Sequence, residues 1–202
     1  AERRIPEDTI AQFKAAHLHK ALLPGRYGGF EGSFETILGV AMHWGRVCPS
    51  TAWSCGLYMA HNWLGALFPQ QCQDDVWGEN PDALISGSYA PVGKVTPAPG
   101  GWRLSGRFPF SSGVPGADWN LCSAMIPKPE GGFLPCFTLV PKKDYVIDWA
   151  SWKVVGMAGT GSNDMIVEQV FVPDRDHAAV DLAAHATPAD GAEVFGFAER
   201  ET

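Results

Sequence analysis

The chain contains few features that would build a disulfide framework or a zinc site. Its 202 residues include five cysteines, an odd number, and no two of them form a Cys-x-x-Cys pair. This pattern favours reduced thiols that fill the core of a cytoplasmic protein, and it predicts no metal site. The five cysteines are Cys48, Cys55, Cys72, Cys122 and Cys136.

Positive charge is also scarce. The chain has 15 Lys and Arg against 22 Asp and Glu, a net charge of −7 with no basic cluster. Binding to phosphate backbones or anionic lipids needs clustered cations, so this composition argues against nucleic-acid and membrane partners. The N-terminus carries no secretory pattern. The longest uncharged stretch, residues 47–73, is broken by prolines and glutamines and predicts a buried helix rather than a membrane span.

Apolar periodicity predicts helices in the first 81 residues. Ile10, Phe13, Leu18 and Leu22 follow helical spacing within Pro6–Leu23. Ser33 is a good N-cap for a second helix that ends near Pro49. A third helix, from Ser50, is apolar on almost every side, which is typical of a buried helix. A short fourth helix is expected between Pro69 and Gly78.

After about Asp82 the pattern changes to short apolar runs separated by Gly and Pro, as in an all-β barrel or sandwich. The sequence therefore predicts an α+β fold, with a helical domain over 1–81, a β domain over 82–175 and a tail or linker over 176–202. The expected strands are Ala83–Ala90, Trp102–Phe110, Asn120–Met125, Phe133–Val140 and Asp164–Val172.

The most specific segment is Ser105–Trp119, with the sequence SGRFPFSSGVPGADW. It places two adjacent hydroxyls, Ser111 and Ser112, where a strand ends after the aromatic Phe110. A flat ring could lie against Phe110 while the serines bond its polar edge. The alternative is an ordinary strand and turn, because Ser, Gly and Pro are common turn residues.

Three segments together resemble the acyl-CoA dehydrogenase superfamily: SGRFPFSSG followed by ADW, the run Trp152–Pro173, and the run Leu22–Thr36. Dehydrogenases tend to carry Trp-Ile-Thr-Asn where this chain has Phe-Ser-Ser-Gly. The chain is therefore more similar to the flavin-dependent monooxygenase branch, the oxygenase components of two-component aromatic hydroxylases. The resemblance implies that these residues form the first two domains and that the C-terminal four-helix bundle is absent from this chain.

The resemblance also implies roles for residues in three segments. Ser112 would face the flavin N5 and accept its hydrogen, which preserves a C4a-hydroperoxyflavin, and Phe110 would lie along the ring face. For each residue the alternative is a structural role in a turn or core. The implied cofactor-binding residues are Ser88 and Tyr89, near Ser86; Phe110, Ser111, Ser112 and Gly113; and Thr160, Gly161 and Ser162.

His61, on the third predicted helix, is the second catalytic candidate. In the phenol hydroxylases that the chain resembles, a histidine on the corresponding helix contacts the substrate oxygen. With an ordinary pKa of about 6.5 it could accept a phenol proton. The alternative is a core histidine without a catalytic role. We expect His17, His19 and His43 to be exposed to solvent.

The resemblance implies an enzyme that uses reduced FMN or FAD, supplied by a separate flavin reductase, and O2 to hydroxylate a small aromatic substrate. A homodimer or tetramer is expected. Two alternatives stay open: an acyl-CoA dehydrogenase, and a non-catalytic flavin-binding or scaffold subunit. One departure bears on the substrate, because relatives commonly carry Arg at the position of Ala158.

Overall fold

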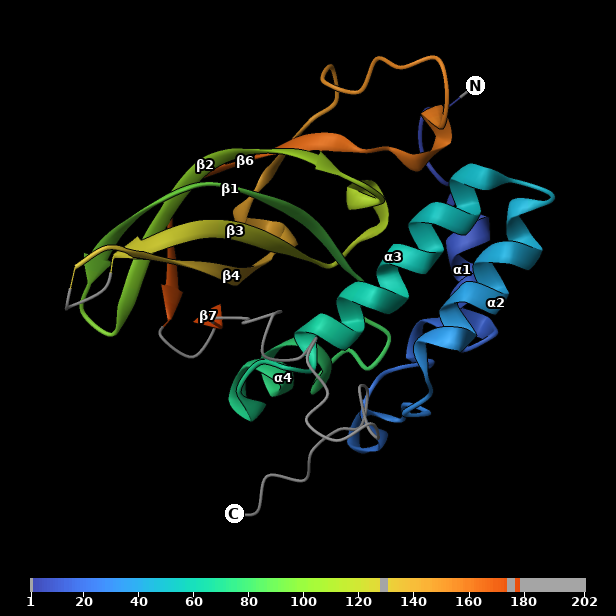
Figure 1. Cartoon of the computed structure of the whole chain (residues 1–202), viewed down its shortest axis with the longest axis horizontal. Helices are drawn as coiled ribbons and strands as arrows, with labels where there is room; N and C mark the ends of the chain where they lie inside the picture. Colours follow the sequence, from blue (N-terminus) through green and yellow to red (C-terminus); the bar gives the residue numbers. More distant parts are fainter. Residues whose placement is uncertain (1, 128–130, 174–176, 179–202) are drawn as a thin grey trace.

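The structure, a computed structural model, describes residues 2–127, 131–173 and 177–178. Helices form its first part and strands its second, which confirms the predicted α+β class (Figure 1). The helices are α1 (Glu7–Ala15), α2 (Phe34–Gly45), α3 (Pro49–Gly65) and α4 (Gln70–Trp77). The strands are β1 (Ile85–Ala98), β2 (Gly101–Ser111), β3 (Trp119–Pro127), β4 (Phe133–Pro141), β5 (Val146–Asp148), β6 (Asn163–Pro173) and β7 (His177–Ala178).

The first helix is shorter than predicted. It ends at Ala15 because His17 adopts a left-handed conformation with φ 55°, and a 3-10 turn, Leu18–Lys20, follows. The apolar residues of Pro6–Leu23 still reach the core, since Phe13 and Leu22 are each 1% exposed. A change of backbone conformation therefore replaces the single predicted helix without removing its buried face.

The strands form one sheet in the order β5-β6-β2-β1-β3-β4-β7 within the described part of the chain. The first half of β1 pairs parallel with β3, and its second half pairs antiparallel with β2. The change of partner coincides with an irregularity between Ser88 and Gly93, where Pro91 lies. Proline is tolerated at such a site because its missing N–H leaves no ladder bond unmade. The predicted strand Ala83–Ala90 thus continues to Ala98.

The pairing of β2 with β6 contains two bulges, one on each strand. Between the pairs Leu104–Val170 and Gly106–Val167 the extra residue lies on β6, and between Phe108–Met165 and Ser111–Asn163 it lies on β2. Each bulge contains a non-glycine residue at positive φ, Gln169 at 52° and Phe110 at 57°. The second bulge bends the strand directly before the two predicted site serines.

The long helix α3 lies between the sheet and helices α1 and α2 (Figure 1). Its C-terminal end shares one apolar cluster with α4 and with strands β1, β3 and β4, through residues that include Leu64, Trp77, Ile85 and Leu121. Packing is so close that a Cβ on Gly65 would lie 2.6 Å from Ile85 Cδ1. The helices and the start of the sheet therefore share a core. A second cluster lies between β2 and β6 on one side and β3 and β4 on the other.

Candidate active site between helix α3 and the sheet

Helix α3 presents a stripe of buried polar residues to the sheet. Ser54, Tyr58, His61 and Asn62 follow the i, i+4, i+7, i+8 spacing of one helical face, and each is at most 1% exposed. Each donates a hydrogen bond to a backbone carbonyl outside the helix, to Thr160, Gly113, Ile85 and Ala83 respectively. The sequence showed a helix apolar on almost every side, and its few polar residues face the strands rather than solvent.

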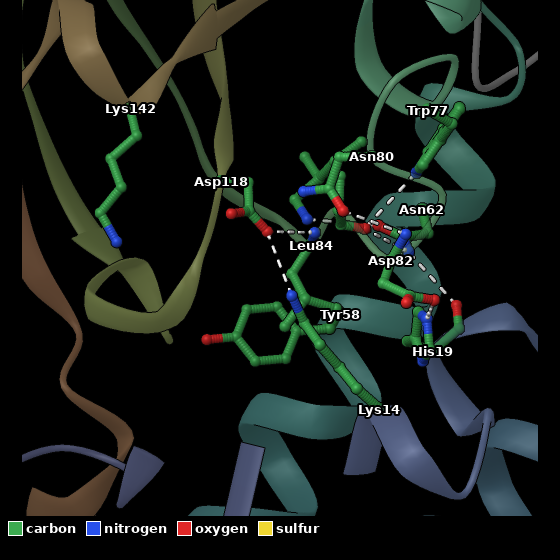
Figure 2. Close-up of polar contacts among 12 residues, drawn as sticks. Lys14, His19, Tyr58, Asn62, Trp77, Asn80, Asp82, Leu84, Asp118 and Lys142 are labelled. Carbon is green, nitrogen blue, oxygen red and sulfur yellow. Dashed lines mark hydrogen bonds and ion pairs between the residues drawn. The ribbon is translucent and has the colours of Figure 1, made fainter. Parts of the chain in front are cut away.

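Asn62 fixes the beginning of β1. Its amide nitrogen donates to the carbonyls of His19 at 3.2 Å and Ala83 at 3.3 Å, and its oxygen accepts from the Ile85 N–H at 3.2 Å. Figure 2 shows this amide between the His19 and Ala83–Ile85 segments. Asp118 acts similarly, accepting from the Leu84 N–H at 2.9 Å. These bonds fix the start of β1, the strand whose Ile85 carbonyl contacts His61.

The expectation that His19 is exposed to solvent is wrong. His19 is 0% exposed, and its Nε2 lies 2.9 Å from Asp82 Oδ1 (Figure 2). Burial lowers its pKa, and the hydrogen bond to Asp82 opposes that shift. The 3-10 turn after α1 rotates this residue inward, which the continuous helix predicted from the sequence would not do. His17 and His43 are exposed, as predicted.

His61 is buried and only half satisfied. Its Nδ1 lies 3.1 Å from the Ile85 carbonyl, and because a carbonyl only accepts, Nδ1 carries the proton. Nε2 is therefore a lone-pair acceptor, and it has no hydrogen-bond partner among the described residues. The ring meets Tyr89 edge-on, with centroids 5.5 Å apart. A Cβ on Gly87 would lie 3.4 Å from Nε2, so a glycine keeps that edge of the ring uncrowded.

Burial also changes the acid–base properties of His61. Loss of solvation lowers its pKa to about 4, and the bond to the Ile85 carbonyl opposes this only in part. The pKa of about 6.5 assumed from the sequence is therefore wrong for this site. A neutral imidazole with a free Nε2 accepts a hydrogen bond well, but it is a weak base toward a phenol.

The turn Ser112–Gly113 is anchored to helix α3 through Tyr58. The Tyr58 hydroxyl donates to the Gly113 carbonyl, and burial raises the tyrosine pKa, so the hydroxyl keeps its proton. Gly113 has φ 77°, and a Cβ there would lie 2.7 Å from the Tyr58 oxygen. Only glycine meets both demands, the left-handed backbone and the close approach of the tyrosine.

Ser112 is the first member of a chain of three buried hydroxyls. Its Oγ lies 2.8 Å from Ser162 Oγ, which lies 2.6 Å from Thr160 Oγ1. The Thr160 hydroxyl donates to the Met157 carbonyl at 3.0 Å, and the Trp53 indole N–H donates to Ser112 Oγ at 3.1 Å. The Gly113 N–H donates to the Thr160 carbonyl at 2.8 Å. The structure thus brings two predicted segments, Ser111–Gly113 and Thr160–Ser162, into direct contact.

Phe110 lies beside this chain on the β2 bulge. Its side chain is 69% exposed, although the residues on both sides of the bulge, Phe108 and Ser111, are 0% exposed. The ring meets Trp152 edge-on at 6.3 Å. A bulky residue at positive φ is strained, and such strain is typical of functional sites. Trp152 also lines a hollow of about 470 Å³ together with Trp149, Asn163 and residues 2–4.

Of the remaining predicted residues, the serines make hydrogen bonds within the sheet and Tyr89 packs against two rings. Ser111 and Ser86 are 0% exposed, and both hydroxyls accept from the Asn120 amide, so their side chains hold β1, β2 and β3 together. The Ser88 hydroxyl donates to the Pro109 carbonyl at 2.7 Å, next to the bulge. Tyr89 is 49% exposed and packs between His61 and Phe137.

Three residues that the sequence does not predict as site residues bond predicted ones: Trp53, Tyr58 and Asn120. Trp53 is 53% exposed, which is unusual for a tryptophan on a helix that otherwise packs inward, and its indole bonds Ser112. No sequence signal separates it from the core aromatics of α3. Asn120 at the start of a buried strand is a signal, because a buried amide requires polar partners.

None of the helices in the described residues is long and apolar enough to cross a membrane. No group of three or more His, Cys, Asp or Glu in residues 2–127, 131–173 and 177–178 could hold a metal ion. All five cysteines lie in the described residues: Cys48 is exposed, the other four are buried, and none is in a disulfide.

Solved structures share this arrangement of helices and sheet. The chain aligns with the HsaA monooxygenase from M. tuberculosis with TM-score 0.83 and 34% identity, over 88% of this chain and 46% of that one. It aligns with XiaF from Streptomyces sp. in complex with FADH2 and glycerol with TM-score 0.82 and 30% identity, over 89% and 45%.

A curated relative agrees. The chain is 44% identical over 172 residues to the oxygenase component of an FADH2-dependent resorcinol hydroxylase from Rhizobium sp. (strain MTP-10005), covering 85% of this chain and 42% of that protein. No family model matches. The homologues of this chain are thus flavin-dependent oxygenase components of two-component hydroxylases, which confirms the predicted resemblance. The chain spans less than half the length of the curated relatives it matches.

Proposed function

We propose that the complete protein is the oxygenase component of a two-component flavin-dependent monooxygenase that hydroxylates a phenolic substrate. Reduced flavin, as FADH2 or FMNH2, would come from a separate reductase. The homology to resorcinol and p-hydroxyphenylacetate hydroxylases supports this class of substrate. In this proposal residues up to about 81 form an N-terminal helical domain and residues from about 82 a middle β domain. The rest of the site would come from outside the described residues.

The observation that carries the proposal is the position of Ser112 beside Phe110. The exposed ring of Phe110 offers a flat apolar contact, and Ser112 offers a hydroxyl two residues away. This combination fits one face and one polar edge of an isoalloxazine ring. Reduced flavin, when bound, supplies the electrons that activate O2. The part of this chain is to hold the ring and to place the Ser112 oxygen at N5.

His61 would bind the substrate. Its Nε2 is a buried acceptor with no partner in the described structure, and a phenol O–H is a donor that would satisfy it. Proton transfer is opposed, because a phenol with a pKa of about 10 would have to protonate an imidazole with a pKa of about 4. The gap of about 6 units corresponds to roughly 8 kcal/mol. We therefore propose that His61 orients the phenol through a hydrogen bond and leaves the proton on it.

Apolar side chains exposed along α2 and the turn after it support association. Leu38 is 61% exposed, Met42 71% and Val47 88%. Single exposed apolar residues are common, but three within ten positions form a patch that another surface can cover. We propose a homodimer or tetramer for the complete protein, which light scattering after size-exclusion chromatography would measure.

Anaerobic titration tests the flavin site directly. FAD and FMN, each oxidised and dithionite-reduced, are added to the complete wild-type protein and to its Ser112→Ala and Ser105→Ala variants. Ser105 carries a hydroxyl on the same strand, far from the turn. Ser112→Ala is expected to weaken binding of the reduced flavin about fivefold to tenfold, the worth of one hydrogen bond. Ser105→Ala should match wild type. Absence of binding of either flavin in both oxidation states would overturn the flavin site.

The reaction itself is tested on the complete protein with a flavin reductase, NADH, resorcinol and 18O2. A monooxygenase should place one 18O atom in each hydroxylated product molecule. Consumption of NADH with hydrogen peroxide as the sole product, across a panel of phenols, would contradict the proposal.

A further inference from the structure

The hydroxyl chain at Ser112 has a fixed direction, and that direction follows from counting protons. Each Ser or Thr hydroxyl has one proton to donate and two lone pairs to accept with. Thr160 uses its proton on the Met157 carbonyl, which can only accept. In the contact between Thr160 and Ser162 the donor must therefore be Ser162.

Ser162 has used its proton on Thr160, so in the contact between Ser112 and Ser162 the donor must be Ser112. The indole N–H of Trp53 donates to Ser112 and takes one of its lone pairs. Ser112 is left with no proton to offer and one lone pair free. All three hydroxyl residues are at most 7% exposed, so bulk water does not compete for these bonds.

We infer that Thr160 and Ser162 make Ser112 an obligate hydrogen-bond acceptor, and that this acceptor selects the oxidation state of the flavin. The inference rests on the proposed function, in which Ser112 meets the flavin N5. Reduced flavin carries a hydrogen on N5, which can be donated to Ser112. Oxidised flavin has a lone pair at N5, which would face the lone pair of Ser112. Thr160 and Ser162 are positioning residues, because they act on the ring through Ser112.

Backbone contacts hold the segment that carries Thr160, so the hydrogen bonds between the three hydroxyls cannot easily reverse their direction. The Thr160 N–H donates to the Met157 carbonyl at 3.1 Å, in addition to the hydroxyl at 3.0 Å. Its own carbonyl accepts from the Gly113 N–H and from the Ser54 hydroxyl. Met157 and Gly161, on either side, both have φ 56°. The terminal acceptor is thus a carbonyl fixed by a short turn, and it sets the polarity of every bond back to Ser112.

Two substitutions release the Ser112 proton by different routes. Thr160→Val keeps the side-chain shape but removes the acceptor of the Ser162 proton, so Ser162 can donate to Ser112 instead. Ser162→Ala removes the acceptor of the Ser112 proton itself. In both variants Ser112 can turn its proton toward the ring and bond the N5 lone pair of oxidised flavin.

The experiment is the ratio of the dissociation constants for oxidised and reduced FAD, measured anaerobically on the complete protein. Wild type is expected to bind reduced FAD more tightly. Thr160→Val and Ser162→Ala should each lower the ratio of the oxidised to the reduced dissociation constant about fivefold to tenfold, mostly because oxidised FAD binds more tightly. Thr160→Ser, which keeps the hydroxyl, should retain the wild-type ratio within about twofold.

Trp53→Phe is the matched control, since it removes a donor to Ser112 but leaves the direction of the chain unchanged. It should alter binding in both oxidation states alike, and thermal unfolding of each variant shows that it is folded. A ratio unchanged in both Thr160→Val and Ser162→Ala would overturn the inference while the proposed function stands. No FAD binding by wild type in either state would instead remove the proposed function, and the inference with it.

Discussion

The two ends of the candidate site are built from the same helix but are completed differently. At the Ser112 end, every hydroxyl proton and the Trp53 N–H have an acceptor within the described chain. At the His61 end, a buried ring nitrogen has none. An unpaired buried acceptor costs about 1 to 3 kcal/mol, so folding alone does not favour it. The chain itself fixes the polarity of the Ser112 end, whereas the His61 end keeps an unpaired acceptor, which we propose a donor group of the substrate satisfies.

Substitution of Gly113 should have the largest effect, because it breaks the Ser112 end at its closest contact. Gly113→Ala combines a strained φ with a Cβ placed 2.7 Å from the Tyr58 oxygen. We expect a loss of about 3 kcal/mol or more in the free energy of unfolding, measured by urea denaturation. Gly100→Ala is the control, since Gly100 has φ 74° and nothing within 4 Å of the added Cβ. Its loss should be about 1 kcal/mol. Equal losses would show that the Tyr58 contact is not tight.

The His61 end should respond to pH. The pKa of His61 is about 4 in the folded protein and about 6.5 in the unfolded chain. Between these values the unfolded state binds a proton that the folded state does not, so stability falls as the pH falls. From pH 7 to pH 5 the loss is about 2 kcal/mol. The free energy of unfolding is measured by urea denaturation at both pH values. Between them it should fall by about 2 kcal/mol more in wild type than in His61→Gln. Parallel pH dependences would mean that His61 titrates normally.

A smaller effect tests the hydroxyl that supports the turn. Tyr58→Phe leaves the buried Gly113 carbonyl without its side-chain donor and should cost about 1.5 kcal/mol of unfolding free energy. Tyr145→Phe is the matched control, because the Tyr145 hydroxyl is buried without a partner in the described structure. Removing an unpaired hydroxyl should be neutral or stabilising. If the two substitutions cost the same, the bond to Gly113 contributes nothing measurable.

The smallest effect should be of opposite sign. Phe110→Asn puts a residue that tolerates positive φ on the β2 bulge, and we expect stability to rise by about 0.5 kcal/mol while flavin affinity falls. Gln169→Asn, at the other bulge, should relieve similar strain without changing flavin affinity. A drop in stability for Phe110→Asn, or unchanged flavin affinity, would show that the ring at position 110 serves packing rather than binding.

Most of the secondary structure could be predicted because local chemistry determines it. The fourth helix lies between Pro69 and Gly78, and the strand Asn163–Pro173 matches the predicted alternation closely. β1 was predicted too short, because a proline inside a strand is acceptable only where the strand changes partner. No property of Pro91 in the sequence reveals that change.

The sequence indicated part of the candidate site but none of its connections. Ser112 and the Thr160–Ser162 segment were both predicted as flavin-binding residues, yet the contact between Ser112 and Ser162 spans 50 residues of sequence. The pKa of His61 could not be predicted, because it depends on how completely the sheet covers α3. The burial of His19 could not be predicted either, because it depends on the left-handed conformation of His17, which redirects the backbone. Solvation and long-range contact are properties of the folded molecule.

The two bulges between β2 and β6 shift the register of the strands in opposite directions, so the second cancels the offset that the first introduces. The extra residue at Gln169 offsets the two strands by one position, and the extra residue at Phe110 restores the alignment. A deletion of either residue alone would leave a one-residue slip, which turns each side chain to the opposite face. Changes in length in this segment are therefore tolerated only in pairs. A one-residue deletion at one bulge is therefore expected to be compensated by a one-residue deletion at the other, about 60 residues away in the sequence.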